Sequence, residues 1–231
     1  RPMSRNPLWR YQPAYLVRST PALANGFVTF GSCNNLGKLS DEVLTLWGQL
    51  LAAVSGAHLL IEGKNLDKPD FAQAYRQRCV RLGIDSARLD LVGLDIANQY
   101  LTYHRIDIAL DPFPLTGGTT TFDLLWMGVP VVSMVGTSFK SRMGVGILRY
   151  LGRTEWIAQD ADAYLQIARE LASDSAALNT LRQGLRAELE QSVLMQEDWF
   201  NHHFGNGLRS MWLHWLAQTL HPGDAPAQAQ A

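Results

Sequence analysis

The residues best suited to chemistry lie in the segment LDPFPLTGGTTTFDLLW, residues 110–126. Gly117 and Gly118 would let the backbone approach a ligand closely, and the helix expected after them presents unpaired N–H groups and a partial positive charge. Asp123, about one turn later, could accept hydrogen bonds from sugar hydroxyls. Three threonines add hydroxyl donors at the helix entrance: Thr119, Thr120 and Thr121. Together these features predict a phosphate-binding site.

The same segment also fits a purely structural role. Thr120 and Asp123 have the spacing of a capping-box variant. The prolines Pro112 and Pro114 would then only shape the loop, and the glycines would only permit the turn. Both interpretations remain open at this point.

A second polar loop, GSCNNLGKLS (residues 31–40), follows the first expected strand. It carries Asn34, Asn35 and Lys38 before a helix start at Ser40. Lys38 could place a compact positive charge on a diphosphate, although a single lysine before a helix is more often simply solvated. Because the loops that follow parallel strands converge at one edge of the sheet, we expect the two polar loops to meet.

No metal site is expected. Asp160 and Asp162 have the Asp-x-Asp form used by some metal-dependent sugar transferases, but they begin a helix, where acidic residues favour the dipole. His202 and His203 are adjacent and would lie on different faces of a helix. The sequence has no GxSxG, Walker or GxGxxG motif, and it identifies no catalytic residue.

Composition excludes several classes of protein. Twenty basic and 21 acidic side chains give a formal charge of -1 over 231 residues, so no overall field attracts nucleic acid or an anionic membrane. The two cysteines, Cys33 and Cys79, form no CxxC pattern and favour a reducing compartment. With no signal peptide and no membrane-spanning run recognisable, we predict a cytoplasmic protein.

Short apolar runs alternate with amphipathic stretches, as in repeated βα units around a parallel sheet. The strands are expected at residues 27–30, 58–62, 89–93, 106–110, 129–134 and 155–158. The helices between them are expected at residues 40–54, 69–82, 96–103, 119–127 and 141–151, with only helices from 161 to 220. The fold class is therefore α/β, a Rossmann-like parallel sheet flanked by helices with a helical C-terminal extension.

The chain is expected to contain one large domain. Residues 1–25 are rich in proline and aromatic side chains and are predicted to form an extended linker packed on a neighbour. Residues 26–220 would form the Rossmann-like, ligand-binding domain with its terminal helices. Residues 221–231, rich in alanine and glutamine, are predicted to be a disordered tail.

Three motifs, in this order, resemble a known family: FVTFGSCNNLGKLS, RIDIALDPFPLTGGTTTFDLLWMGVPVVSM and GTSFKSRMGVGILRYLG. The family is that of the protein O-GlcNAc transferases and their bacterial, tetratricopeptide-linked, SPINDLY-like relatives. The resemblance covers about residues 26–171 and implies the C-terminal lobe of a GT-B glycosyltransferase. It also implies an N-terminal catalytic lobe and tetratricopeptide repeats outside this sequence.

The resemblance assigns roles by position. Lys38 matches the lysine on the donor diphosphate, and Asn35 matches a polar residue beside it. Thr119 and Thr120 match hydroxyls at the phosphate-binding helix, and Asp123 matches the acid that contacts ribose. The base would lie against the loop that follows the third strand, which includes Leu94, Ile96 and Gln99.

Three positions depart from the best-known members of the family. Gly118 and Gln99 each stand where those members have a histidine, and Ile96 stands at or near a lysine on the uracil side. The departures leave diphosphate binding intact but leave the base open. The donor could be UDP-GlcNAc or, as in the SPINDLY branch, GDP-fucose.

The resemblance implies an inverting transfer of sugar to Ser/Thr hydroxyls of a protein acceptor, without a metal cofactor. Any general base would come from the N-terminal lobe. Two alternatives stay open: a lobe that senses a nucleotide sugar without turnover, and a nucleotide-dependent dehydrogenase, which the absent glycine fingerprint disfavours.

Overall fold

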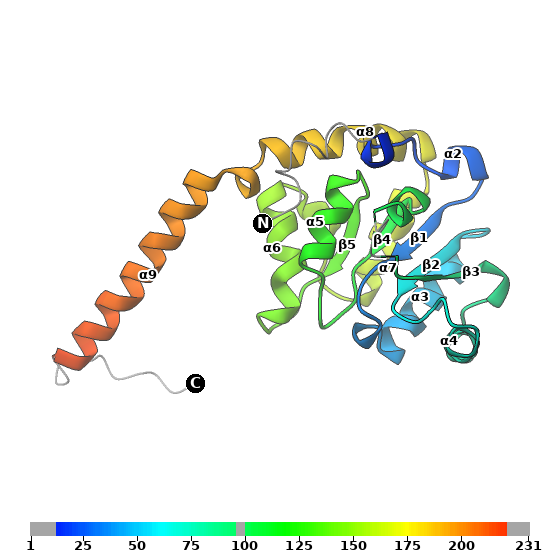
Figure 1. Cartoon of the computed structure of the whole chain (residues 1–231), viewed down its shortest axis with the longest axis horizontal. Helices are drawn as coiled ribbons and strands as arrows, with labels where there is room; N and C mark the ends of the chain where they lie inside the picture. The colour runs from blue at the N-terminus through cyan, green and yellow to red at the C-terminus, as the bar shows by residue number, and fades with distance from the viewer. Residues whose placement is uncertain (1–12, 96–99, 221–231) are drawn as a thin grey trace.

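The computed structural model describes residues 13–95 and 100–220, and its centre is a six-stranded parallel sheet (Figure 1). The strand order is β3-β2-β1-β4-β5-β6. The strands are β1 Thr29–Ser32, β2 His58–Gly63, β3 Leu89–Gly93, β4 Ile108–Leu110, β5 Val131–Met134 and β6 Ile157–Ala158. The predicted Rossmann-like α/β fold is therefore confirmed, and β1 and β4 lie side by side at its centre.

Helices connect the strands. The α-helices are α2 Ala22–Asn25, α3 Asp41–Ala53, α4 Pro69–Arg81, α5 Thr119–Trp126, α6 Met143–Leu151, α7 Ala161–Ala172, α8 Ser175–Gln191 and α9 Glu197–Leu220. The 3-10 helices are η2 Pro13–Tyr15, η3 Leu36–Lys38, η4 Ser86–Arg88, η5 Thr102–Arg105, η6 Lys140–Arg142, η7 Thr154–Trp156 and η8 Val193–Met195. Ser40 caps α3 as predicted, accepting a hydrogen bond from the Val43 N–H at 3.3 Å.

Several predicted boundaries are wrong. The helix expected at 96–103 is not formed over its described part, where η5 occupies Thr102–Arg105; residues 96–99 lie outside the described residues. Strand β4 begins at Ile108 instead of Ile106, because the Ile106 N–H is used to close η5 on the Tyr103 carbonyl. Strand β5 begins after Pro130, which has no N–H to donate to a ladder.

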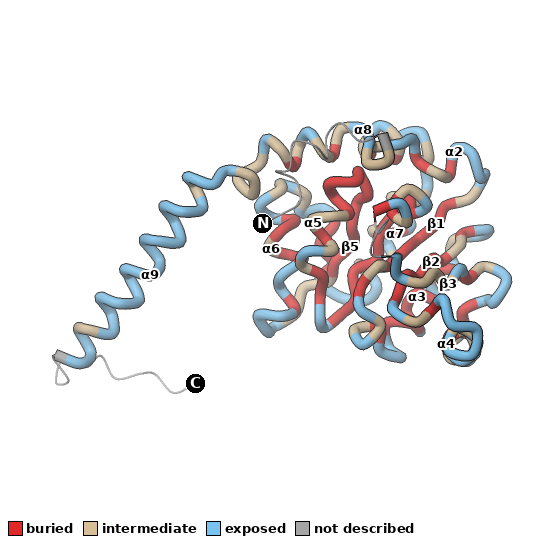
Figure 2. Tube along the Cα trace, viewed as in Figure 1, coloured by how far each residue is buried: buried red, intermediate tan, exposed pale blue. Residues whose placement is uncertain are grey.

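Apolar side chains bury both faces of the sheet. Along β2, Leu59 and Ile61 enter one core with α3, α4 and α7, whereas Leu60 enters the other with α5 and α6. This alternation is the two-residue period of a strand. Figure 2 shows the buried residues concentrated along the strands, with exposed residues outside. A sheet covered on both faces leaves only its edges and the ends of its strands for a ligand.

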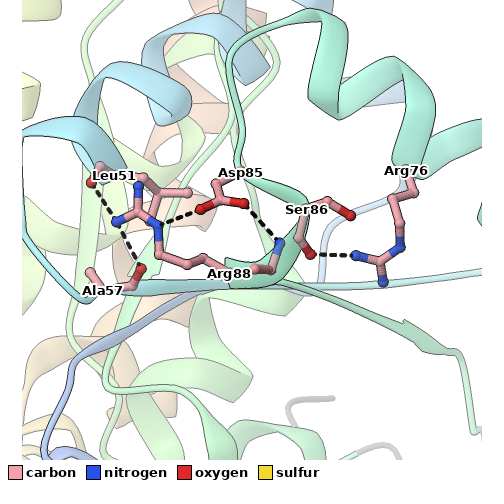
Figure 3. Close-up of polar contacts among 7 residues, drawn as sticks. Leu51, Ala57, Arg76, Asp85, Ser86 and Arg88 are labelled. Carbon is pink, nitrogen blue, oxygen red and sulfur yellow. Dashed lines mark hydrogen bonds and ion pairs between the residues drawn. The ribbon is translucent and has the colours of Figure 1, made fainter.

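The edge strand β3 is held at its start by two arginines (Figure 3). Arg88 donates to the Leu51 carbonyl at 2.8 Å and lies 3.6 Å from the carboxylate of Asp85. Arg76 of α4 donates to the Ser86 carbonyl at 2.9 Å. These bonds tie η4, which leads into β3, to α3 and α4, and they lie at the amino end of β3, away from the carboxyl edge.

Residues 13–25, expected to be an extended linker, contain η2 and α2 and pack on the chain's own α8. Buried Arg182 of α8 donates to the carbonyls of Ile106 at 2.7 Å and Arg18 at 3.0 Å. Buried Asp107 accepts from the Thr20 hydroxyl at 2.5 Å and from the Thr29 N–H at 2.8 Å. Both charges are thus satisfied by hydrogen bonds that fasten this segment to the sheet.

Helix α9 extends away from the domain (Figure 1) and is exposed along most of its length (Figure 2). Trp212 and Trp215 are 58% and 52% exposed, so neither packs in the core of this chain. Within residues 13–95 and 100–220, no helix is both long and apolar enough to cross a membrane. The predicted tail at 221–231 lies outside the described residues.

Candidate functional site

The two polar loops meet at the carboxyl edge of the sheet, as predicted. The ammonium of Lys38 donates to the Thr116 carbonyl at 2.9 Å and to the Asn34 side chain at 3.2 Å. This contact follows from the fold, because β1 and β4 are adjacent and parallel and their following loops emerge together. Lys38 is half-buried, so its charge lies at the junction of the loops and not free in solvent.

Helix α5 begins beside this junction without a side-chain cap. Its N-cap is Gly118, and the first helical bond runs from the Phe122 N–H to the Gly118 carbonyl at 3.2 Å. The capping-box interpretation of Thr120 and Asp123 is therefore wrong. Within the residues that the structure describes, the hydroxyls of Thr119 and Thr120 have no hydrogen-bond partner, and Thr119 is exposed. The helix N-terminus keeps its donors available for an anion.

The other predicted diphosphate residues are placed differently. Thr121 is buried, and a Cβ added at Gly117 would overlap its hydroxyl, so Thr121 packs closely against the turn. Asn35 accepts a hydrogen bond from the Gly37 N–H at 2.9 Å and begins η3. Its side chain thus shapes the turn that presents Lys38.

Asp111 is a buried residue that holds the loop of residues 111–122, called here the threonine loop, in place. The sequence did not predict this role. This carboxylate is 1% exposed and accepts from the Gly117 N–H and the Ser133 hydroxyl, each at 2.6 Å. Gly144 of α6 packs so closely against it that a Cβ there would overlap the carboxylate. Burial raises the pKa of Asp111 to about 6, against the lowering effect of the Ser133 and Gly117 hydrogen bonds. The only sequence signal was an Asp-Pro step after a strand.

The predicted ribose side lies one turn into α5. Asp123 is half-buried, and burial raises its pKa to about 6, while a hydrogen bond from Tyr100 lowers it. Leu94, at the end of β3, is 44% exposed. Ile96 and Gln99, the other two residues predicted on the base side, lie outside the described residues.

A second acidic residue, which the sequence did not single out, lies near Asp123. Glu62 is the second-to-last residue of β2 and lies beside Cys33, which follows β1. Burial raises the pKa of the Cys33 thiol well above its usual value, and the negative charges of Glu62 and Asp123 raise it further. Cys33 is therefore expected to remain a neutral thiol.

The arrangement contains no ready cation site. Among residues 13–95 and 100–220, no group of three His, Cys, Asp or Glu side chains could hold a metal ion. Asp160 accepts from the Ala163 N–H at 2.8 Å as the N-cap of α7, which confirms the interpretation of the Asp-x-Asp sequence as a helix start. Chemically, the site combines one lysine, an open helix N-terminus and hydroxyl donors, with carboxylates to one side.

Comparison with known proteins gives a consistent result. The family described as glycosyl transferase family 41 matches residues 13–204. A curated relative from Petunia hybrida, named a probable UDP-N-acetylglucosamine–peptide N-acetylglucosaminyltransferase SPINDLY, is 37% identical over 91% of this chain. The Arabidopsis thaliana relative of the same name is 38% identical over 85% of this chain. The chain spans 22% of the length of each of these two relatives.

Solved structures agree with the fold. A mutant O-GlcNAc transferase from Thermobaculum terrenum superposes with a TM-score of 0.76 at 32% identity, over 87% of this chain and 38% of that one. HepE of Anabaena, solved with UDP and glucose, superposes with a TM-score of 0.54 at 15% identity, over 86% of this chain and 53% of that one, and shows the fold alone. The predicted GT-B lobe is confirmed, and the dehydrogenase alternative is wrong.

Proposed function

Because the chain belongs to glycosyl transferase family 41, we propose that it is the donor-binding lobe of a protein O-glycosyltransferase. The observation that carries the proposal is the junction at Lys38, which joins the loops after β1 and β4 beside the uncapped start of α5. A diphosphate placed there would meet a lysine, helix N–H groups and the hydroxyls of Thr119 and Thr120. Asp123 would accept hydrogen bonds from the ribose.

The same groups can assist the departure of the nucleoside diphosphate. Negative charge develops on the leaving diphosphate as the glycosidic bond breaks, and fixed donors stabilise that charge without reorganising. A serine or threonine hydroxyl of the acceptor protein would attack the anomeric carbon from the opposite face and invert its configuration. Lys38, α5 and the threonines supply the stabilisation that a metal ion supplies in other transferases.

The remaining parts of the reaction belong to the longer protein. An N-terminal lobe would contribute acceptor contacts and any general base, and tetratricopeptide repeats would recruit protein acceptors in the cytoplasm. The relatives' names indicate UDP-GlcNAc as donor. GDP-fucose is the other donor that the site would accept, since a diphosphate and a ribose are common to both.

A sensor that binds the nucleotide sugar without turnover is the second candidate. One observation favours it: Gly118 stands where transferases of the family have a histidine. A Cβ at Gly118 would lie 2.8 Å from the Met143 methyl group, so the present packing leaves no room for a larger side chain without moving Met143.

Calorimetric titration of the chain with UDP, GDP, UDP-GlcNAc and GDP-fucose tests the proposal. We expect one base series to bind, and EDTA to leave its affinity unchanged. A requirement for magnesium or manganese would contradict the metal-free site, and the absence of binding by all four compounds would contradict the proposed function.

A further inference from the structure

Glu62 is a buried carboxylate with an unused oxygen. It is the second-to-last residue of β2, is 3% exposed, and receives a hydrogen bond from Thr102. Within the described residues, its Oε2 atom has no hydrogen-bond partner, and no lysine or arginine forms an ion pair with it. A buried acceptor without a donor is destabilising, and a ligand that carries an N–H or O–H group would satisfy it.

The strand order places Glu62 where the base of a bound nucleotide would lie. Strand β2 lies between β1, which leads to Lys38, and β3, with Ser32 of β1 opposite Ile61 and Val92 of β3 opposite Glu62. A nucleotide with its diphosphate at Lys38 and its ribose at Asp123 can extend over Cys33 toward this strand end. Thr102 and Asp123 are half-buried, so part of this edge is exposed to solvent.

We propose that Glu62 selects guanine as the base of the donor, by accepting hydrogen bonds from N1–H and from the exocyclic amino group. This inference rests on the proposed function and specifies the nucleobase of the donor. Guanine offers two adjacent donors on one edge, which match a carboxylate as a pair. Uracil offers a single N–H between two carbonyl oxygens, and a carboxylate facing that edge would meet two like partial charges.

Titration of the unaltered chain with GDP, IDP and UDP tests the selection directly. IDP differs from GDP by the missing amino group, so its loss leaves Glu62 with an unused acceptor. We expect GDP to bind at least tenfold more tightly than IDP and UDP. Equal affinity for GDP and IDP, or a preference for UDP, would overturn the inference while leaving the proposed function intact.

The variant Glu62→Gln gives a second, independent test. We expect GDP to bind at least tenfold more weakly and UDP to change less than twofold. We also expect XDP to bind the variant more tightly than it binds the unaltered chain, because the glutamine amide can donate a hydrogen bond to the C2 carbonyl of xanthine. The matched control is Glu170→Gln, an exposed glutamate on α7, which should change none of these affinities. Thermal melting verifies that the buried substitution leaves the fold intact, and if it does not, the GDP–IDP comparison decides.

A role for Glu62 at the ribose would look different. Both nucleotides carry the same ribose, so Glu62→Gln would then weaken GDP and UDP equally, and this outcome would overturn base selection. Failure of every nucleotide to bind the unaltered chain would overturn the proposed function and this inference together.

Discussion

Asp111 shows how a single buried charge can support a loop. Its carboxylate joins the Gly117 N–H of the loop to the Ser133 hydroxyl of β5, and its own carbonyl accepts from Tyr164 of α7 at 3.0 Å. The Gly117 N–H is therefore already used, and a diphosphate must take its donors from the next residues along α5. In the proposed site, Asp111 would position those donors without touching the diphosphate.

Ionisation of Asp111 should make stability depend on pH. Its folded pKa, about 6, is above the usual 3.8, so the protonated side chain is favoured by folding. The stabilisation is fully present below about pH 4 and is lost as pH rises through 6. Between pH 5 and pH 8 the chain should lose about 1.4 kcal/mol of unfolding free energy through this group. Denaturant unfolding of the chain and of Asp111→Asn at both pH values measures the difference.

Asparagine keeps an acceptor for Gly117 but cannot ionise, so the pH dependence of the variant should be weaker by that amount. Asp90→Asn, at an exposed carboxylate, is the control. Identical pH dependence in the chain and in Asp111→Asn would show that the raised pKa makes no contribution to stability.

Lys38→Ala should lower affinity for a nucleoside diphosphate at least tenfold. One charge-assisted hydrogen bond contributes about 1.5–3 kcal/mol, which corresponds to tenfold or more. Because Lys38 also donates to the Thr116 carbonyl, we expect a small accompanying destabilisation, about 1 kcal/mol. Calorimetry and thermal melting measure the two effects. Lys68→Ala, at an exposed lysine before α4, should change neither; equal affinity after Lys38→Ala would remove this lysine from the site.

At the scale of elements, helix α6 packs against the buried residues that support the candidate site. Gly144 faces Asp111 and Ser133, and an added Cβ there would lie 2.8 Å from the Ser133 hydroxyl. Gly146, two residues later on the same helix, has no neighbour within 4 Å of such a Cβ. The two glycines therefore provide a matched pair for testing how tightly α6 must pack.

Gly144→Ala should destabilise the chain by about 1–3 kcal/mol, because the overlap forces α6 or Asp111 to move. Gly146→Ala should be neutral or stabilise by up to about 1 kcal/mol, since alanine favours a helix interior. Chemical denaturation of both variants checks the contrast. A Gly144→Ala variant as stable as Gly146→Ala would mean that α6 can shift away from Asp111 at little cost.

The sequence predicted elements better than contacts. Alternating apolar runs indicated the six strands, and Ser40 marked the start of α3, because both signals are local. The meeting of Lys38 with the threonine loop was also predictable, since parallel strands share one edge. Asp111 was not, because its partners Ser133 and Gly144 are distant in sequence and meet only after folding. Arg182 was missed for the same reason: its bonds cross more than 70 residues.

At the scale of the whole molecule, the chain corresponds to only part of the length of its relatives. It spans 22% of its curated plant relatives and 38% of the solved O-GlcNAc transferase. Its described residues bring together, at one edge of a single sheet, the groups that we propose for a diphosphate, a ribose and a base. In the proposed two-lobe enzyme, the opposing wall that positions a protein acceptor would come from the N-terminal lobe.

Sugar transfer should therefore require more than residues 1–231. Positioning two reactants can account for several kcal/mol of a barrier, about 7–11 kcal/mol in well-oriented intramolecular reactions, and one lobe supplies positioning for the donor alone. We expect measurable nucleotide binding by the chain but no transfer of labelled sugar from UDP-GlcNAc or GDP-fucose to lysate proteins. The longer protein with its N-terminal lobe should transfer from one of the two donors. Transfer by the isolated chain would mean that this lobe already contains a complete active site. A longer protein that binds nucleotide tightly yet transfers sugar from neither donor would favour the sensor function.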